Sequence, residues 1–278
     1  MSIVIVGPGI GGLAAALSLH EAGHRDVRVF ERVADLRPLG VGINLLTAAV
    51  CALTELGLMV RMAEPAAAPS TPAYFNRYGQ RIWCEPRGSH AGYRWPQLSV
   101  YRGRLQRILL ETVHDRLDPE AVLTGHQLVA VEHGVDADVA CSDTDAGVVR
   151  GGADVVVRAG GIHSALHGSN GASQTILDAR TPALHLTTAP TVEQALTRYE
   201  ADRRPPTTAL VHSNRRQVRE HVMVPAHERA PHGFGDIGEV FAPGELADYA
   251  TSCKRAAVFH PDAPNSRQSL TRRASADE

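Results

Sequence analysis

The chain has 278 residues, of which 44% are hydrophobic and 21% are charged, and this composition is typical of a globular protein with a substantial core. Its formal net charge of -2 and its sequence pI of about 6.7 give no electrostatic reason to expect nucleic acid or an anionic membrane as a partner. We therefore expect neither nucleic acid nor a membrane as a partner. The first residues carry no cationic segment of a secretory signal and the four cysteines lie far apart, so we expect a cytoplasmic protein without a disulfide framework or a zinc site.

The first thirty residues predict a βαβ unit that binds a dinucleotide. A β-branched run, an alanine- and leucine-rich segment and a second apolar run predict a strand, a helix and a strand over 3–6, 13–22 and 26–31. Between the first strand and the helix, Gly7, Gly9 and Gly12 form the motif Gly-x-Gly-x-x-Gly. In this motif the first glycine permits a tight turn, the second lets a pyrophosphate approach the backbone, and the third lets the helix pack closely on the strand. The phosphates then lie at the positive N-terminus of the helix.

Glu31 ends the second predicted strand, roughly 20 residues beyond the motif, where a carboxylate accepts hydrogen bonds from ribose hydroxyls. An acid at this position disfavours a 2′-phosphate, so the residues favour FAD or NAD over NADP. The alternative is a glycine-rich turn that serves packing alone, and it leaves the position of Glu31 unexplained.

The next segments separate FAD from NAD. A plain NAD-binding domain would continue with alternating strands and helices, whereas here a glycine-punctuated loop over 37–45, which contains Gly42, precedes an amphipathic helix over 46–58. Arg102 opens a further predicted helix, and a guanidinium at such a helix start suits a diphosphate. The alternative for Arg102 is a solvated surface arginine.

Three blocks, over 37–44, 85–88 and 99–110, resemble the class A flavoprotein monooxygenases, a family of aromatic hydroxylases, and among them the phenazine-modifying members. The resemblance implies FAD as the cofactor, NAD(P)H as a co-substrate and a small aromatic compound as the substrate. It also implies that Arg102 contacts the FAD pyrophosphate or ribityl chain, and that the helix beginning near Gly171 directs its positive end at the flavin ring. The flavin carries the reaction, so we expect no acid–base catalyst. The cofactor-binding residues that we expect are Gly7, Gly9, Gly12, Glu31, Gly42, Arg102 and Gly171.

After predicted antiparallel hairpins over 122–149, the sequence departs from that family. Gly160 stands where the family has an aspartate that organises the FAD and NAD(P)H region, and Arg158 stands where it has glycine. The blocks that meet at His167–Gly168 are separated in the family by a substrate-covering domain, on the order of 100 residues or more. The sequence therefore predicts an internal deletion at this junction.

The C-terminal part predicts a helix from 172 to about 186 that is kinked or ended at Pro182, because a proline inside a helix removes a backbone donor. The family resemblance resumes over 199–205 and 214–216, and a polar, disordered tail is expected after these blocks.

Together these patterns predict an α/β fold, in which a Rossmann-type parallel-sheet FAD-binding domain carries an antiparallel β excursion and a C-terminal helical segment. The expected parts are an FAD-binding part over 1–167, a flavin-side helix and helical part over 168–255, and a disordered tail over 256–278. Three functions stay open: a flavin-dependent monooxygenase impaired by loss of the substrate domain, a non-catalytic flavin- or nucleotide-binding remnant, and an NAD-dependent oxidoreductase. No pattern in the sequence predicts the oligomeric state.

Overall fold

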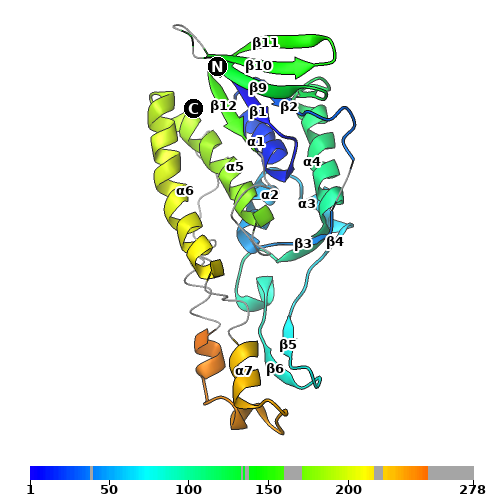
Figure 1. The fold of residues 1–278 in the computed structure, drawn as a ribbon, viewed down its shortest axis with the longest axis vertical. Coiled ribbons are helices and arrows are strands. Elements are labelled where there is room, and N and C mark those ends of the chain that lie inside the picture. Colours follow the sequence, from blue (N-terminus) through cyan, green and yellow to red (C-terminus); the bar gives the residue numbers. More distant parts are fainter. Residues whose placement is uncertain (38–39, 133, 135–137, 160–170, 216–221, 250–278) are drawn as a thin grey trace.

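A four-stranded parallel sheet forms the centre of the protein (Figure 1). The structure is a computed structural model that describes residues 1–37, 40–132, 134, 138–159, 171–215 and 222–249. The strand order is β12-β1-β2-β8, with the bounds Val155–Arg158, Ser2–Val6, Asp26–Phe30 and Val122–Leu123. β2 pairs with one edge of β1, and β12, which follows much later in the chain, pairs with the other edge, so the strand order reverses at β1. Open α/β sheets bind their ligands at the carboxyl ends of the strands beside such a reversal of strand order.

The predicted departure at Gly160, the predicted deletion at His167–Gly168 and the predicted tail over 256–278 all lie outside the described residues.

Different structures cover the two faces of the parallel sheet, because successive side chains of a strand point to opposite faces. Ile3 and Ile5 of β1 belong to the main core with the helices, whereas Val4 and Phe30 cluster with Ala140. This smaller cluster joins the parallel sheet to an antiparallel sheet with the order β11-β10-β9, whose strands span Gly147–Ala153, Asp138–Thr144 and Gln127–Glu132. The predicted antiparallel excursion is thereby confirmed.

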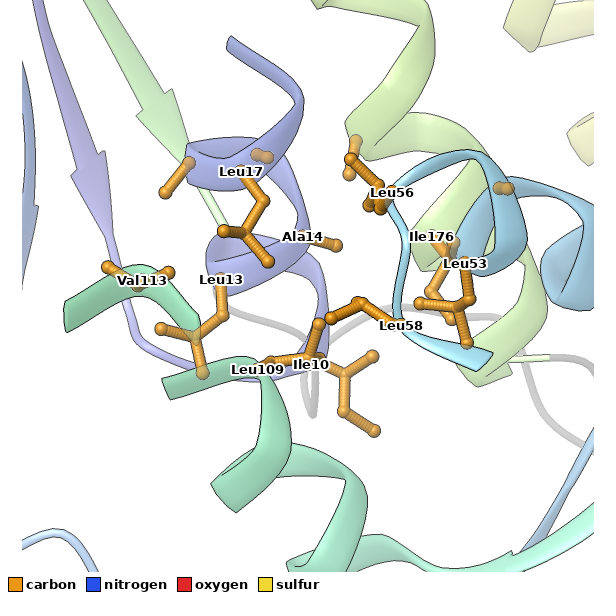
Figure 2. Packing of buried hydrophobic residues seen from close by; sticks show 14 of the residues in the cluster. Ile10, Leu13, Ala14, Leu17, Leu53, Leu56, Leu58, Leu109, Val113 and Ile176 are labelled. Atoms are coloured by element: carbon orange, nitrogen blue, oxygen red, sulfur yellow. The ribbon is translucent and has the colours of Figure 1, made fainter. Parts of the chain in front are cut away.

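The helices of the main core surround α1 (Figure 2). Helices α1 to α5 span Ile10–Glu21, Thr47–Glu55, Met59–Ala63, Arg102–Arg116 and Gly171–Thr188. Every residue of α1 from Ile10 to Leu19 is buried, because apolar or small side chains occupy all of its faces. Figure 2 shows side chains from four helices in one cluster, among them Leu17, Leu53, Leu109 and Ile176.

Two helices have bounds that differ from the prediction. α1 begins at Ile10 rather than at residue 13, because the second half of the glycine motif is already helical. The helix predicted over 46–58 ends at Glu55, because Gly57 adopts a left-handed φ of +70° and reverses the chain before α3. The helix predicted to open at Arg102 is confirmed as α4.

The sequence predicts that α5 is kinked or ended at Pro182, and the structure excludes the second alternative, because α5 contains Pro182 and continues past it to Thr188. Residues on both sides of the proline, Ile176, Ala179 and Ala183, lie in the main core. Tertiary packing therefore holds the helix in place, and it offsets the one backbone hydrogen bond that the proline removes.

Helix α6, Val192–Arg215, contacts α5 through residues 199–205, where the family resemblance resumes. Arg203 donates from Nε to Asp178 Oδ1 at 2.6 Å and from Nη2 to Gln174 Oε1 at 2.6 Å. Burial, with the neighbouring Asp178 carboxylate, raises the pKa of Tyr199 in the same block. This block therefore fixes α6 against the helix that begins at Gly171.

We expect Gly11→Ala to destabilise the contact between α1 and α5, because its Cβ would lie 2.1 Å from Thr175 Cγ2. Overpacking of this kind costs about 1–3 kcal/mol of unfolding free energy. Thr175→Ser removes Cγ2, and the next nearest atom to the new Cβ is then Thr175 Cβ at 3.5 Å, so the double variant should recover most of the loss. Urea unfolding of the wild type, the two single variants and the double variant measures the coupling energy between positions 11 and 175. If Gly11→Ala costs the same unfolding free energy with threonine as with serine at position 175, the contact is contradicted.

A smaller unit lies at the other end of the molecule from the antiparallel sheet (Figure 1). It combines the hairpin β5–β6 with the last described residues, and its elements are β5 Ala73–Phe75, β6 Arg81–Cys84, α7 Met223–Arg229 and the 3-10 helix η4 Ile237–Glu239. Ile82 of the hairpin packs with Val222 and Phe241 in a core of its own. The remaining elements are β3 Gly42–Leu45, β4 Ala66–Ala67 and β7 Leu98–Tyr101, which form a sheet, and the 3-10 helix η1 Gly88–Ala91.

The parallel sheet, the antiparallel sheets and the C-terminal helices confirm the predicted α/β class. Among the helices that the structure describes, none is long and apolar enough to cross a membrane.

Candidate dinucleotide-binding site

The glycine motif lies at the carboxyl end of β1, where the strand order reverses. Gly7 has a φ of +101°, which side chains rarely allow, and its N–H donates to the Phe30 carbonyl at 2.8 Å. A Cβ on Gly12 would lie 2.0 Å from the Gly7 carbonyl oxygen. Gly7 and Gly12 are therefore required by the turn and by the close approach of α1 to it.

The space beside Gly9 is open. Gly9 is the N-cap of α1 with φ -70° and ψ 178°, and a Cβ built on it meets no heavy atom of the described residues within 4 Å. No side chain of the described residues caps α1, and the N–H groups of its first turn have no acceptor within the helix. Free donors, the positive end of a helix and open space together fit a diphosphate.

Glu31 follows β2 directly, and the carbonyl of its neighbour Phe30 accepts the backbone hydrogen bond from Gly7. Glu31 Oε1 accepts from the Val33 N–H at 2.9 Å, and the Glu31 N–H donates to the Leu123 carbonyl at 2.9 Å. These bonds hold the carboxylate at the carboxyl end of β2. An ionised carboxylate has about four acceptor positions, so the bond to Val33 leaves capacity for ribose hydroxyls.

Arg102 begins α4, and its side-chain stem lies against the glycine-punctuated loop. A Cβ on Gly40, where φ is +138°, would lie 3.0 Å from both Cβ and Cδ of Arg102. Gly42 begins β3, which pairs with β7 immediately before Arg102. Arg102 is half-buried, whereas Arg104 and Arg107 on the same helix are exposed.

Three helices begin at this end of the sheet. The Leu46 N–H, directly before α2, donates to Ser173 Oγ in the first turn of α5 at 2.9 Å. Gly11 in the first turn of α1 faces Thr175 of α5. Gly171, the first residue of α5, therefore lies near the starts of α1 and α2. The structure thus gathers all of the predicted cofactor-binding residues at one end of the parallel sheet, namely Gly7, Gly9, Gly12, Glu31, Gly42, Arg102 and Gly171.

A buried ion cluster joins the C-terminal ends of α1 and α2 to the middle of α5. Arg180 of α5 has 1% of its side chain exposed, and it pairs through Nη1 with Glu21 Oε2 at 2.9 Å and through Nη2 with Glu55 Oε2 at 2.8 Å. Glu21 is the last residue of α1 and Glu55 is the last residue of α2. A carboxylate at a helix C-terminus is unfavourable without a cation, so Arg180 stabilises both ends.

Sequence reasoning missed several residues that shape this site. Gln106 of α4 donates from Nε2 to the Pro8 carbonyl at 2.8 Å, and it lies one helical turn from Arg102, a spacing that points to a shared face. Ser173 and Arg180 join elements far apart in the chain, and no local pattern reveals such contacts.

The chain is similar to several curated proteins over about three fifths of its length. It is 40% identical over 167 residues to phenazine 1,6-dicarboxylic acid hydroxylase of Lysobacter antibioticus, a match that covers 59% of this chain and 41% of that protein. It is 30% identical over 168 residues to the FAD-dependent urate hydroxylase of Mycolicibacterium vanbaalenii, covering 59% and 40%. With 3-amino-4-hydroxybenzoate 2-monooxygenase of Streptomyces cremeus it shares 34% identity over 172 residues, covering 60% and 41%. The chain spans about two fifths of the length of these relatives.

Solved structures show the same fold. Tetracycline destructase Tet(55) has a TM-score of 0.64 at 13% identity, over 96% of this chain and 98% of that one. The p-nitrophenol 4-monooxygenase of Pseudomonas putida has a TM-score of 0.52 at 22% identity, over 60% of this chain and 42% of that one. No protein-family model matches the chain.

The chain has a Rossmann-type α/β fold, with a glycine motif at the carboxyl end of β1. These curated relatives are hydroxylases and a monooxygenase of aromatic compounds, and the urate hydroxylase is FAD-dependent, which confirms the predicted resemblance.

Proposed function

We propose that the chain binds FAD as a member of the flavin-dependent monooxygenases. The observation that carries this proposal is the open, uncapped N-terminus of α1 at Gly9, in a chain whose homologues include FAD-dependent enzymes. In this proposal, the diphosphate lies on the first-turn N–H groups of α1, and Glu31 accepts from the ribose hydroxyls.

The other predicted residues complete the same site. Arg102 pairs with the pyrophosphate or stabilises the ribityl chain, and Gly42 lets the adjoining loop approach the cofactor. Gly171 begins a helix whose positive end stabilises negative charge near the flavin ring. In domain terms, residues 1–167 form the FAD-binding part, residues 168–255 form the flavin-side helical part, and residues 256–278 are a tail.

The proposed reaction is NAD(P)H-dependent hydroxylation of a small aromatic compound. Bound FAD supplies the redox and oxygen chemistry, while the residues of this chain bind it, orient it and exclude water. Since the sequence predicts an internal deletion at His167–Gly168, we propose that hydroxylation is impaired and that NAD(P)H oxidation is uncoupled from it. The four scattered cysteines, which predict no disulfide framework, lead us to propose a cytoplasmic location.

A second candidate is a flavin- or nucleotide-binding protein without catalytic activity. The observation that favours it is again the predicted internal deletion, because a flavin site without a covered substrate side cannot hold an aromatic ring in place.

The visible spectrum of the purified full chain tests the proposal. We expect flavin absorbance as isolated, or after titration with FAD, and a folded, colourless protein that takes up no FAD would contradict it. NADH and NADPH oxidation, measured together with hydrogen peroxide and hydroxylated product, then separates the candidates. Peroxide without hydroxylated product supports the impaired monooxygenase, whereas bound flavin without NAD(P)H oxidation supports the second candidate.

A further inference from the structure

One side chain of α4 reaches the glycine motif. Gln106 Nε2 donates to the carbonyl oxygen of Pro8 at 2.8 Å, and the contact is half-buried. Pro8 lies between Gly7 and Gly9, so this oxygen belongs to the peptide unit that joins Pro8 to Gly9. Gln106 therefore acts on the orientation of one backbone unit in the motif.

The geometry of a peptide unit couples that carbonyl to the Gly9 N–H. The unit is planar and trans, so its C=O and its N–H point in opposite directions. With the Pro8 carbonyl held toward α4, the Gly9 N–H points away from α4. Without Gln106, little opposes rotation of the unit, because Gly9 has no Cβ and the space beside it is open.

We propose that Gln106 is a positioning residue for a diphosphate ligand. It holds the Pro8–Gly9 peptide so that the Gly9 N–H joins the first-turn N–H groups of α1 as a phosphate donor. Gln106 acts through the backbone and does not itself touch the ligand. This inference rests on the proposed function, and it adds a residue on the same face of α4 as Arg102.

The test compares ADP with adenosine, two ligands that share the adenine and ribose and differ in the diphosphate. Gln106→Met keeps the length of the side chain and removes its donor. We expect the Kd for ADP to rise about tenfold, the equivalent of one hydrogen bond, while the Kd for adenosine stays unchanged and the urea midpoint of the ligand-free protein falls only slightly, because one half-buried hydrogen bond is lost. The matched control is Gln194→Met on α6, where the side chain is exposed, and it should bind both ligands as the wild type does.

Three results would overturn the inference. Equal ADP affinity in Gln106→Met and wild type would show that the bond does not position a donor. A parallel loss for ADP and adenosine would show a structural role only. If the wild-type protein binds neither ADP nor FAD, the proposed function fails, and the inference fails with it.

Discussion

Gly9→Ala is expected to abolish tight FAD binding and to leave the protein folded. Alanine adopts φ -70° and ψ 178° without strain, and its Cβ meets no heavy atom of the described residues within 4 Å. The unfolding free energy should therefore change by no more than about 0.5 kcal/mol. In the proposed complex, however, that Cβ occupies the space through which the diphosphate approaches the backbone, so we expect a loss of about a hundredfold or more in FAD affinity.

Gly12→Ala is the matched comparison, because it places the same methyl group on the other side of the motif. Its Cβ would lie 2.0 Å from the Gly7 carbonyl oxygen, a backbone atom that cannot rotate away. This variant should lose FAD binding together with about 1–3 kcal/mol of unfolding free energy. Fluorescence titration with FAD and urea unfolding measure the two quantities. Normal FAD affinity in Gly9→Ala would contradict the placement of the diphosphate.

Arg180→Met is expected to give the largest loss of stability. The substitution fills a similar volume but leaves the Glu21 and Glu55 carboxylates without their shared buried cation. Removing one partner of a buried ion pair costs about 3–5 kcal/mol, whereas replacing the whole cluster by neutral groups is often close to neutral. The triple variant Arg180→Met, Glu21→Gln, Glu55→Gln should therefore recover much of the loss.

Arg180→Lys tests the geometry of the same cluster. A lysine presents one point charge where arginine reaches both carboxylates, so it should recover only part of the stability. The control is Arg204→Met on α6, whose side chain is 75% exposed and pairs with Glu200, and it should change the unfolding free energy by less than about 1 kcal/mol. Urea unfolding of these variants measures the differences. A triple variant as unstable as Arg180→Met would show that the uncompensated carboxylates are not the cause.

Local patterns in the sequence predict the first βαβ unit well. The β-branched run of β1 and the glycine motif are determined by neighbouring residues, and the structure has them in the predicted places. The early end of α2 follows from a signal of the same kind, the glycine at position 57, which the amphipathic pattern over 46–58 concealed. The continuation of α5 through Pro182 was not predictable from propensity, because packing against α1 decides it.

The residues of the candidate site also differ in how well the sequence predicts them. The motif glycines, Glu31 and Arg102 each carry a local signature, and the structure brings them to one end of the sheet. Arg180 and Gln106 have none, because their partners lie on other elements and only the tertiary fold brings them together. A single sequence therefore does not reveal the residues that hold the elements of the site in place through tertiary contacts.

β1 lies inside the sheet, so it needs a partner strand on each edge, and these two strands are synthesised at different times. The ribosome delivers Ser2–Val6 about 150 residues before Val155–Arg158, so one edge of this strand stays unpaired until Val155–Arg158 has been synthesised. α5, which helps to bury α1, follows later still. An apolar strand with an open edge readily pairs with other chains, so the nascent protein is most prone to aggregate before its second half emerges.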